Sequence, residues 1–251
     1  MPALQASVAI PALNEERYLP ALLQSLCEQQ EVTLDVVVVE ARSEDQTVAA
    51  ANRVIAANGN PNVKIRLFTV EQRNVSFQRN YAIGRTRFEH LFFLDSDVRL
   101  PHRYWAHDVL RKHLYHGAAV STCRFVPSEP HLLAHLYYAI LYVFHQAMRA
   151  ATPYAIGAML LTSRRIYDRL GGFDPELTLN EDANFVKRAS RLGRFDVLPD
   201  ACFISARRLL QGGFFKTGLL YLRIFLHRTL HGEMQHDMGY WNERGDDLLP
   251  Q

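Results

Sequence analysis

The chain has 251 residues, of which 48% are hydrophobic and 22% are charged, and its formal net charge is +2. This length and composition indicate one large globular domain or two small ones, and exclude disordered, collagen-like and low-complexity chains. The near-balanced charge also argues against a general nucleic-acid binder. Of the 28 basic residues 24 are Arg, whose planar guanidinium matches the geometry of phosphates and other anions.

Cysteine usage and hydropathy bear on the cellular compartment. Cys27, Cys123 and Cys202 lie far apart, so neither a disulfide framework nor a zinc site is predicted, and a reducing environment is expected. The longest apolar run, 136–144, has nine residues, fewer than the ~20 that a membrane span needs. The first residues lack the pattern of a signal peptide. We therefore expect a cytoplasmic protein.

The first hundred residues alternate between β-rich runs and stretches with a helical period of apolar residues. Strands are predicted at 7–11, 34–39, 63–70 and 90–94, and helices at 15–27, from Ser43 onward and at 76–87. This alternation predicts an α/β fold with a doubly wound, mostly parallel sheet and helices on both faces. In such sheets, ligands bind beyond the carboxyl ends of the strands.

The second half of the chain is less regular. Helices are predicted at 101–116, 131–151, 163–170 and 181–192, strands at 117–126 and 195–198, and a small apolar stretch lies at 155–162. Residues 201–232 include basic side chains but no acidic one. Because the chain shows no linker and no internal repeat, we predict a single compact domain with a C-terminal helical extension.

Two carboxylates follow the fourth predicted strand, in Asp95-Ser96-Asp97. Holding two carboxylates together is costly without a cation, and oxygen ligands of this kind suit Mg²⁺ or Mn²⁺. The alternative is an ordinary acidic turn, since Asp is common in turns. The position directly after a buried strand of a doubly wound sheet favours the metal site.

Polar side chains also follow the other strands of the first half. Asn14 is predicted to cap the helix after the first strand, whose free N–H groups form an anion site. Glu40 ends the second strand, where its carboxylate can accept from a base N–H or a ribose hydroxyl. Arg73 and Arg79 follow the third strand.

Together these segments resemble the family 2 inverting nucleotide-sugar glycosyltransferases, which have the GT-A fold. The matching segments are Pro11, Asn14 and Glu15, then Glu40-Ala41-Arg42-Ser43-Glu44-Asp45-Gln46-Thr47, Arg79-Asn80-Tyr81-Ala82, Asp95-Ser96-Asp97, Gly171-Gly172-Phe173-Asp174 and Glu181-Asp182. The resemblance covers about residues 6–230. It rests on the order of the motifs, because each motif alone is a weak signal.

The resemblance implies a nucleoside-diphosphate sugar as donor, and an acceptor that is a sugar, a lipid-linked molecule or a small molecule. It implies that Asp95 and Asp97 hold Mn²⁺ or Mg²⁺. Ala41 and Arg42 replace residues that are usually Asp and Gly in the family, so the base is not identified. The expected donor-binding residues are Pro11, Asn14, Glu15, Glu40, Arg42, Arg79, Asn80, Ser96, Arg207 and Arg208.

The attacking acceptor hydroxyl needs a base for its proton. In the context of the matching motifs, Asp182 is the predicted base and Glu181 orients the acceptor or the base. The alternative is that Asp182 is only a first-turn carboxylate favoured by the helix dipole. On this hypothesis residues 1–100 bind the nucleotide sugar, residues 101–204 bind the acceptor, and residues 205–251 form a basic amphipathic segment.

Other functions stay open at this stage. A nucleotidyltransferase is a second hypothesis, although it normally has a glycine-rich phosphate loop where this chain has Pro11-Ala12-Leu13-Asn14. A non-catalytic nucleotide-sugar-binding or membrane-surface protein is a third. Residues 201–232 combine basic and bulky apolar side chains, so they are predicted either to lie against the inner face of a membrane or to close the core.

Overall fold

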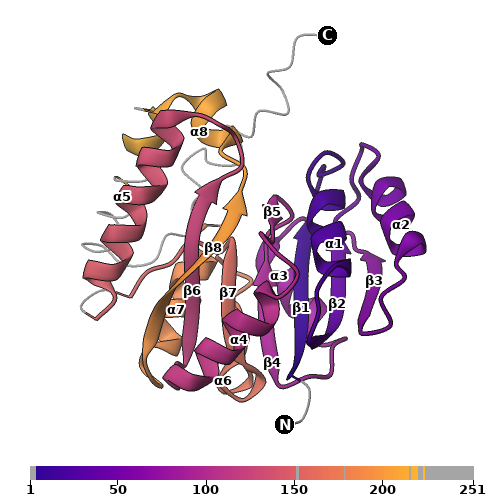
Figure 1. Ribbon diagram of the computed structural model, residues 1–251, viewed down its shortest axis with the longest axis horizontal. Helices are drawn as coiled ribbons and strands as arrows, with labels where there is room; N and C mark the ends of the chain where they lie inside the picture. Colours follow the sequence, from indigo (N-terminus) through magenta and orange to yellow (C-terminus); the bar gives the residue numbers. More distant parts are fainter. Residues whose placement is uncertain (1–3, 151–152, 178, 215, 220–222, 224–251) are drawn as a thin grey trace.

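A mixed β-sheet runs through the middle of the molecule (Figure 1). The computed structural model describes residues 4–150, 153–177, 179–214, 216–219 and 223. The strand order is β3-β2-β1-β4-β7-β6-β8-β5. The strands are β1 (Leu4–Ala12), β2 (Val32–Glu40), β3 (Val63–Thr69), β4 (His90–Leu94), β5 (Val98–Arg99), β6 (Val120–Pro127), β7 (Met159–Ser163) and β8 (Phe195–Ile204). The helices are α1 (Leu19–Cys27), α2 (Thr47–Ala57), α3 (Val75–Ile83), α4 (Trp105–His116), α5 (Leu132–Met148), α6 (Arg164–Leu170), α7 (Glu181–Ala189) and α8 (Arg207–Gly212).

The sheet confirms the predicted α/β fold. Strands β1, β2, β3 and β4 pair in parallel, with α1, α2 and α3 as the crossovers between them. Strand β7 is antiparallel to both β4 and β6, and β6 is parallel to β8. The carboxyl ends of β1, β2 and β4 consequently lie at one edge of the sheet, where ligands bind in open α/β folds.

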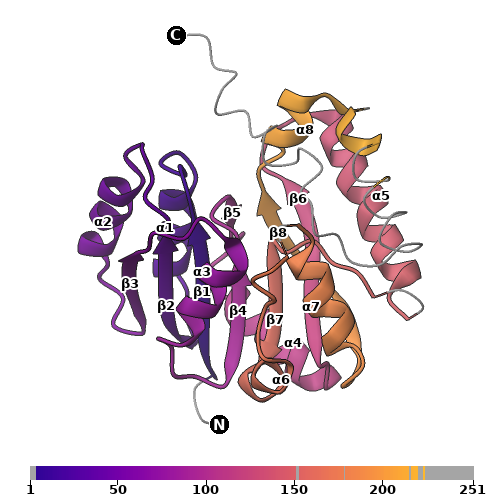
Figure 2. The same cartoon turned by 180° about the vertical axis from the view of Figure 1, so that it is seen from behind.

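Two hydrophobic cores cover the two faces of the sheet. In β2, Val36 and Val38 belong to one core and Val37 and Val39 to the other, as side-chain alternation along a strand requires. Helices α1, α2, α4 and α5 supply the first core, on the face shown in Figure 1. Helices α3, α6 and α7 supply the second, on the face shown in Figure 2.

Several predicted helix and strand boundaries were wrong, because the turns that follow the strands are longer than the periodicity of apolar residues indicated. Helix α1 begins at Leu19, not at Glu15, because the Glu15 carbonyl accepts from the amides of Tyr18 and Leu19 in a tight turn. Helix α2 begins at Thr47, not at Ser43. The short β5 was not predicted, and it pairs with the part of β8 beyond the predicted end of that strand.

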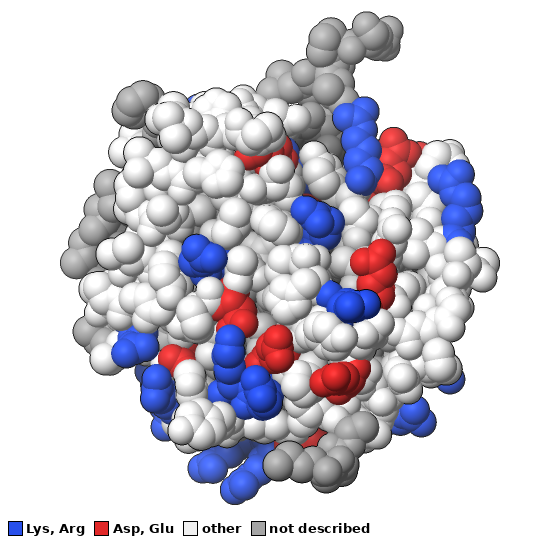
Figure 3. All heavy atoms as spheres, in the orientation of Figure 1, with Lys and Arg blue, Asp and Glu red and all other residues white. Residues whose placement is uncertain are grey.

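The C-terminal segment is described only as far as Leu219 and at Arg223, so most of the segment predicted at 205–251 lies outside the described residues. Within the described part, Leu209 is buried in the core, whereas Leu219 is 58% exposed. In the described ranges, no helix is both long and apolar enough to cross a membrane. Figure 3 shows few charged side chains at the upper left, over α5.

His113 on α4 makes the stability of this fold sensitive to pH. The ring is buried, bonds to the Ser121 hydroxyl at 2.7 Å, and has a pKa lowered to about 4, mainly by burial. In the unfolded chain this ring therefore binds a proton below about pH 6.5, whereas in the folded chain it does so only below about pH 4. The free energy of unfolding consequently falls as the pH drops through this window.

We predict that this ionisation lowers the free energy of unfolding by about 2 kcal/mol between pH 7.5 and pH 5. The His113→Gln variant cannot titrate, so its stability should fall by about 2 kcal/mol less over the same interval. Urea unfolding of both proteins at the two pH values measures the difference. Equal losses in the two proteins would contradict the assignment.

Candidate active site

The predicted functional residues gather where β1, β2 and β4 end, and Gln78 on α3 ties two of these ends together. Its amide nitrogen donates to the carbonyl of Ala12 at 3.0 Å and to that of Val39 at 2.7 Å. Strand β4 ends at Leu94, directly before the Asp95-Ser96-Asp97 turn. The predicted residues then fall into two ionic clusters, one on each side of this turn.

The first cluster is built around Arg79 of α3, which is 1% exposed. Its guanidinium donates to Asp95 at 2.8 Å, to Glu181 at 2.9 Å and to the carbonyl of Gly157 at 3.2 Å. A buried guanidinium is costly to desolvate unless carboxylates compensate it. The contacts therefore join α3, the end of β4 and the start of α7 through one cation.

Asp182 completes this cluster from the first turn of α7. One carboxylate oxygen accepts from the amide of Gly157 at 2.5 Å, and the other accepts from the amide of Ala183 at 2.6 Å. Burial raises the pKa of Asp182, while the nearby Arg79 lowers it. Burial, together with the charge of Asp182, raises the pKa of Glu181 to about 7. The cluster thus holds one carboxyl group, that of Glu181, that can exchange a proton near neutral pH.

Gly157 allows the backbone to approach this cluster. A Cβ at this position would lie 2.8 Å from the Arg79 guanidinium and 2.8 Å from both the Cβ and a carboxylate oxygen of Asp182. Arg79 is held on several sides and cannot move aside cheaply. Any larger residue at position 157 must therefore displace the carboxylate or the guanidinium.

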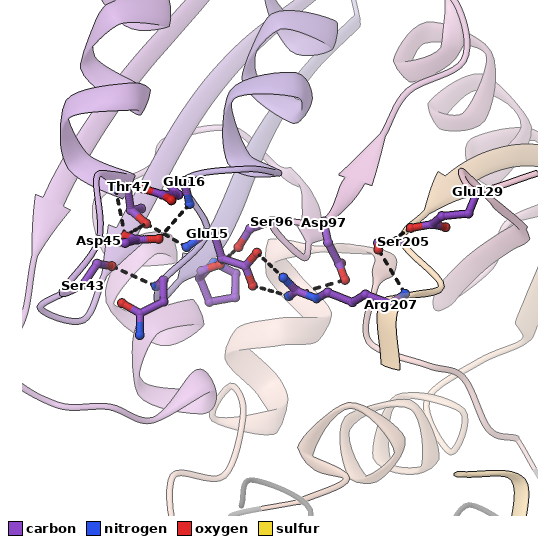
Figure 4. Close-up of polar contacts among 12 residues, drawn as sticks. Glu15, Glu16, Ser43, Asp45, Thr47, Ser96, Asp97, Glu129, Ser205 and Arg207 are labelled. Atoms are coloured by element: carbon purple, nitrogen blue, oxygen red, sulfur yellow. Dashed lines mark hydrogen bonds and ion pairs between the residues drawn. The ribbon is translucent and has the colours of Figure 1, made fainter. Parts of the chain in front are cut away.

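The second cluster is built around Arg207 at the start of α8 (Figure 4). The guanidinium forms a bidentate pair with Glu15, at 3.0 and 2.5 Å, and lies 3.8 Å from Asp97. It also lies over the ring of Tyr18, 4.5 Å from its centroid. Burial raises the pKa of Asp97, and it raises that of Glu15 to about 6 although Arg207 opposes the shift. The charge of Arg208 also lowers both pKa values, so Arg208 lies near this cluster.

The loop before α8 is fixed by Glu129, a residue that the sequence did not single out. The two carboxylate oxygens accept from the hydroxyl of Ser205 at 2.8 Å and from the amide of Ala206 at 2.7 Å. Arg207 follows directly, so this contact positions the guanidinium over the Asp97 turn (Figure 4).

The turns after β1 and β2 are hydrogen-bonded to each other. Asn14 does not cap α1, which corrects the sequence prediction: its side-chain oxygen Oδ1 accepts from the backbone amide of Glu44 at 2.8 Å, and its φ of 54° is left-handed. Ser43 and Thr47 accept from the amides of Asn14 and Glu15 at 3.1 and 2.7 Å. Most of the motif after β2 therefore holds the first turn in place, a role that only the tertiary structure reveals.

Glu40 and Arg42 lie beside these turns. Glu40 is buried and accepts from the amide of Ser43 at 2.8 Å. Arg42 has a left-handed φ of 51°, a conformation that favours glycine, and it pairs with Glu71 at the surface. Glu40 thus shapes the turn, and the exposed Arg42 borders the edge of the sheet where Glu40 ends β2.

Pro11, Ser96 and Asn80 make mainly structural contacts. The Ser96 hydroxyl donates to the carbonyl of Pro11 at 2.6 Å and so joins the ends of β1 and β4. The Asn80 side chain bonds to both the amide and the carbonyl of Phe173, at 2.9 and 2.7 Å, and accepts from Tyr167 at 2.7 Å. Asn80 therefore fixes the Gly172-Phe173 turn, and these bonds occupy the side chain that was predicted to contact the donor.

Asp95 and Asp97 fit a divalent cation that a bound substrate helps to hold. Within the described ranges, no group of three or more His, Cys, Asp or Glu side chains is arranged to hold a metal ion. The side chain of Asp95 is 36% exposed, and the charge of Asp95 raises the pKa of Asp97, so the two carboxylates lie close to each other. Mg²⁺ is commonly held by one or two carboxylates together with substrate phosphates and water, and this pair suits that arrangement.

Comparison with known sequences bears on the identity of this site. The family model for glycosyl transferase family 2 matches residues 7–171. The matched part includes the ends of β1, β2 and β4 and the Asp95-Ser96-Asp97 turn, and it stops before α7. Among curated proteins, none matches the chain.

Solved structures resemble this fold at low sequence identity. Mannosyltransferase PcManGT from Pyrobaculum calidifontis, in complex with GDP-Man and Mn²⁺, is 22% identical with a TM-score of 0.65, over 87% of this chain and 64% of that one. TarS 1–349 from S. aureus, in complex with UDP-GlcNAc, is 22% identical with a TM-score of 0.62, over 81% and 59%. Glucosyl-3-phosphoglycerate synthase from Mycobacterium tuberculosis, in complex with Mg²⁺ and UDP, is 15% identical with a TM-score of 0.56, over 87% and 77%. The match thus spans less than two thirds of PcManGT and of TarS 1–349.

We predict that Gly157→Ala destabilises the protein by about 1–3 kcal/mol, because the new methyl group overpacks the Arg79 cluster. The matched control is Gly59→Ala, since a Cβ at Gly59 meets nothing within 4 Å. The control should change the free energy of unfolding by less than about 0.5 kcal/mol. Urea unfolding measures both variants, and equal effects would show that the cluster yields to the added methyl group.

Proposed function

The chain belongs to glycosyl transferase family 2 and is a glycosyltransferase, and from this premise we propose that it transfers a sugar from a nucleoside-diphosphate sugar to an acceptor hydroxyl, with inversion and with a divalent cation. The observation that carries the proposal is the convergence of Asp95, Glu181 and Asp182 on the buried Arg79. This arrangement places carboxylates from β4 and α7 together at the ligand-binding edge of the sheet.

Residues 1–100 form the donor side of the proposed site. Glu40 and Arg42 border the position for the nucleoside, and Arg207 and Arg208 supply positive charge for the diphosphate. When bound by Asp95 and Asp97, Mn²⁺ or Mg²⁺ would stabilise the negative charge that develops on the leaving diphosphate. Arg207 supports this role because it already lies near Asp97 and is held by Glu15.

Asp182 is the proposed base. Burial raises the pKa of its carboxyl group, which makes the carboxylate a better proton acceptor than a solvated aspartate. Two backbone amides hold the carboxylate at the start of α7, so its orientation is fixed before an acceptor binds. Glu181 shares Arg79 with Asp95, and we assign it the orientation of the acceptor or of the base. Residues 101–204 would then form the acceptor side.

The alternative of nucleotidyl transfer is not favoured. The turn after β1 contains Pro11 and Asn14 in place of a glycine-rich phosphate loop, and the amides of Asn14, Glu15 and Glu16 are bonded to side chains after β2. Those amides are not available to cradle a triphosphate. Two parallel incubations with Mn²⁺ separate the two reactions: with a panel of nucleotide sugars, sugar transfer releases nucleoside diphosphate, and with a nucleoside triphosphate and a sugar phosphate, nucleotidyl transfer releases pyrophosphate.

We predict that Asp97→Asn lowers the transfer rate by a factor on the order of 10² or more, because one of the two proposed metal ligands loses its charge. The control is Asp168→Asn on α6, an exposed carboxylate away from the site, which should keep full activity. Nucleoside-diphosphate release measures both. Full activity of Asp97→Asn, or of the unchanged protein in excess chelator, would refute the metal assignment.

We predict that Asp182→Asn lowers kcat by a factor on the order of 10²–10⁴ and leaves donor affinity unchanged, because only the proton acceptor is removed. Calorimetric titration with the donor gives the affinity, and turnover gives kcat. A weaker donor complex with unchanged kcat would instead assign Asp182 to binding. NMR of the product should show the anomeric configuration opposite to that of the donor.

A further inference from the structure

The ends of two neighbouring strands bring Glu129 to the loop before α8. Strands β6 and β8 are parallel, and their last residues pair in the register. Glu129 lies two positions beyond the end of β6, and Ser205 and Ala206 follow β8 directly. Strand β6 also runs in the same direction as β4, because both are antiparallel to β7. These residues therefore meet at the edge of the sheet where β4 ends and the Asp97 turn begins.

Glu129 is the acceptor for two donors of this loop. One carboxylate oxygen accepts from the hydroxyl of Ser205 at 2.8 Å, and the other accepts from the amide of Ala206 at 2.7 Å. Both residues are buried, with exposed fractions of 7% and 1%. A buried donor that loses its acceptor is left with the cost of desolvation and without the compensating bond. The carboxylate of Glu129 therefore stabilises this particular path of the loop.

The hydroxyl of Ser205 connects Glu129 to Arg207. Its proton is donated to the carboxylate, so its lone pairs can accept from the amide of Arg207, which lies at 3.2 Å. The amide of Ser205 in turn donates to the carbonyl of Asp97 at 3.2 Å. The backbone of Arg207 is thus fixed relative to both Glu129 and the Asp97 turn (Figure 4).

The guanidinium of Arg207 is held by a second set of contacts. Glu15 forms a bidentate pair with it, and the ring of Tyr18 lies 4.5 Å from it. These two residues follow β1, whereas Glu129 follows β6. The arginine is therefore positioned from two sides, and its guanidinium lies 3.8 Å from Asp97. A long side chain that is ordered in advance loses less conformational freedom when a ligand arrives.

We propose that Glu129 is a positioning residue of the donor site, which fixes Arg207 where its guanidinium meets the diphosphate. This role rests on the proposed function, in which Arg207 supplies positive charge for the diphosphate. Glu129 itself does not touch the donor, because its carboxylate is occupied by Ser205 and Ala206. It acts through the backbone of Arg207, so removal of its carboxylate should weaken the binding of a diphosphate.

The test is calorimetric titration of the full chain with UDP, GDP, ADP and CDP in the presence of Mn²⁺. For the nucleotide that binds most tightly, we expect Glu129→Ala to lower the affinity by a factor of about ten, as for one hydrogen bond of a charged group. Glu129→Gln should keep most of the affinity, because its side-chain oxygen can still accept from the amide of Ala206. Circular dichroism establishes that each variant is folded.

The matched control is Glu89→Ala. The carboxylate of Glu89 accepts from the amide of Arg165, and the two residues are separated by 76 positions, as Glu129 and Ser205 are. Glu89 precedes β4 and so lies at the end of that strand opposite to the site. This variant should bind the nucleotide as the unchanged protein does. An equal loss of affinity in Glu89→Ala and Glu129→Ala would overturn the proposal.

A second background separates positioning of Arg207 from a general loss of structure. When Glu129→Ala is added to Arg207→Gln, we expect the affinity to change by less than about twofold, because the group through which Glu129 acts is already gone. A tenfold loss in both backgrounds would contradict the assignment.

Urea unfolding tests the same contact without a ligand. Glu15→Gln should destabilise the unchanged protein more than it destabilises Glu129→Ala, because a displaced Arg207 no longer completes its pair with Glu15. Equal destabilisation would show that Glu129 does not position the guanidinium. If the unchanged protein binds none of the four nucleotides, the proposed function fails instead, so the two failures are distinguishable.

Discussion

The site depends on one buried cation, the guanidinium of Arg79. Asp95 and Glu181 both bond to it, and Asp182 lies close enough for the charges to interact. Without the guanidinium the largely buried carboxylates of Glu181 and Asp182 would lack this positive charge, and an uncompensated buried charge is among the most costly arrangements in a protein. Because its partners come from β4 and α7, the same cation also joins the part of the chain that the family model covers to a part beyond it.

The two aspartates of the Asp95-Ser96-Asp97 turn face different arginines. Asp95 meets Arg79 from α3, and Asp97 meets Arg207 from the start of α8. Each carboxylate therefore already has a cationic neighbour, which limits the repulsion between them. The turn lies between a cluster that contains the proposed base and a cluster that contains the proposed diphosphate contacts, as a transfer between donor and acceptor requires.

The segment before α5 and the proposed site meet at the loop before α8. Glu129, just before α5, holds Ser205 and Ala206, and Arg207 follows them directly. The beginning of α5 and the Asp97 cluster are thus connected through three successive residues.

The amino-acid sequence by itself determined the α/β class, the succession of strands and helices along the chain up to β4 and the carboxylate motifs, because these depend on local periodicity and on residue types next to strand ends. It did not determine how side chains are paired. The sequence suggested that Asn14 caps α1, that Asn80 contacts the donor and that Arg79 is one of two arginines at a strand end. The tertiary structure bonds Asn14 to Glu44 rather than to the start of α1, bonds Asn80 to Phe173, and pairs Arg79 with Glu181. Such contacts join segments separated by 30 to 102 positions, and no local pattern encodes them.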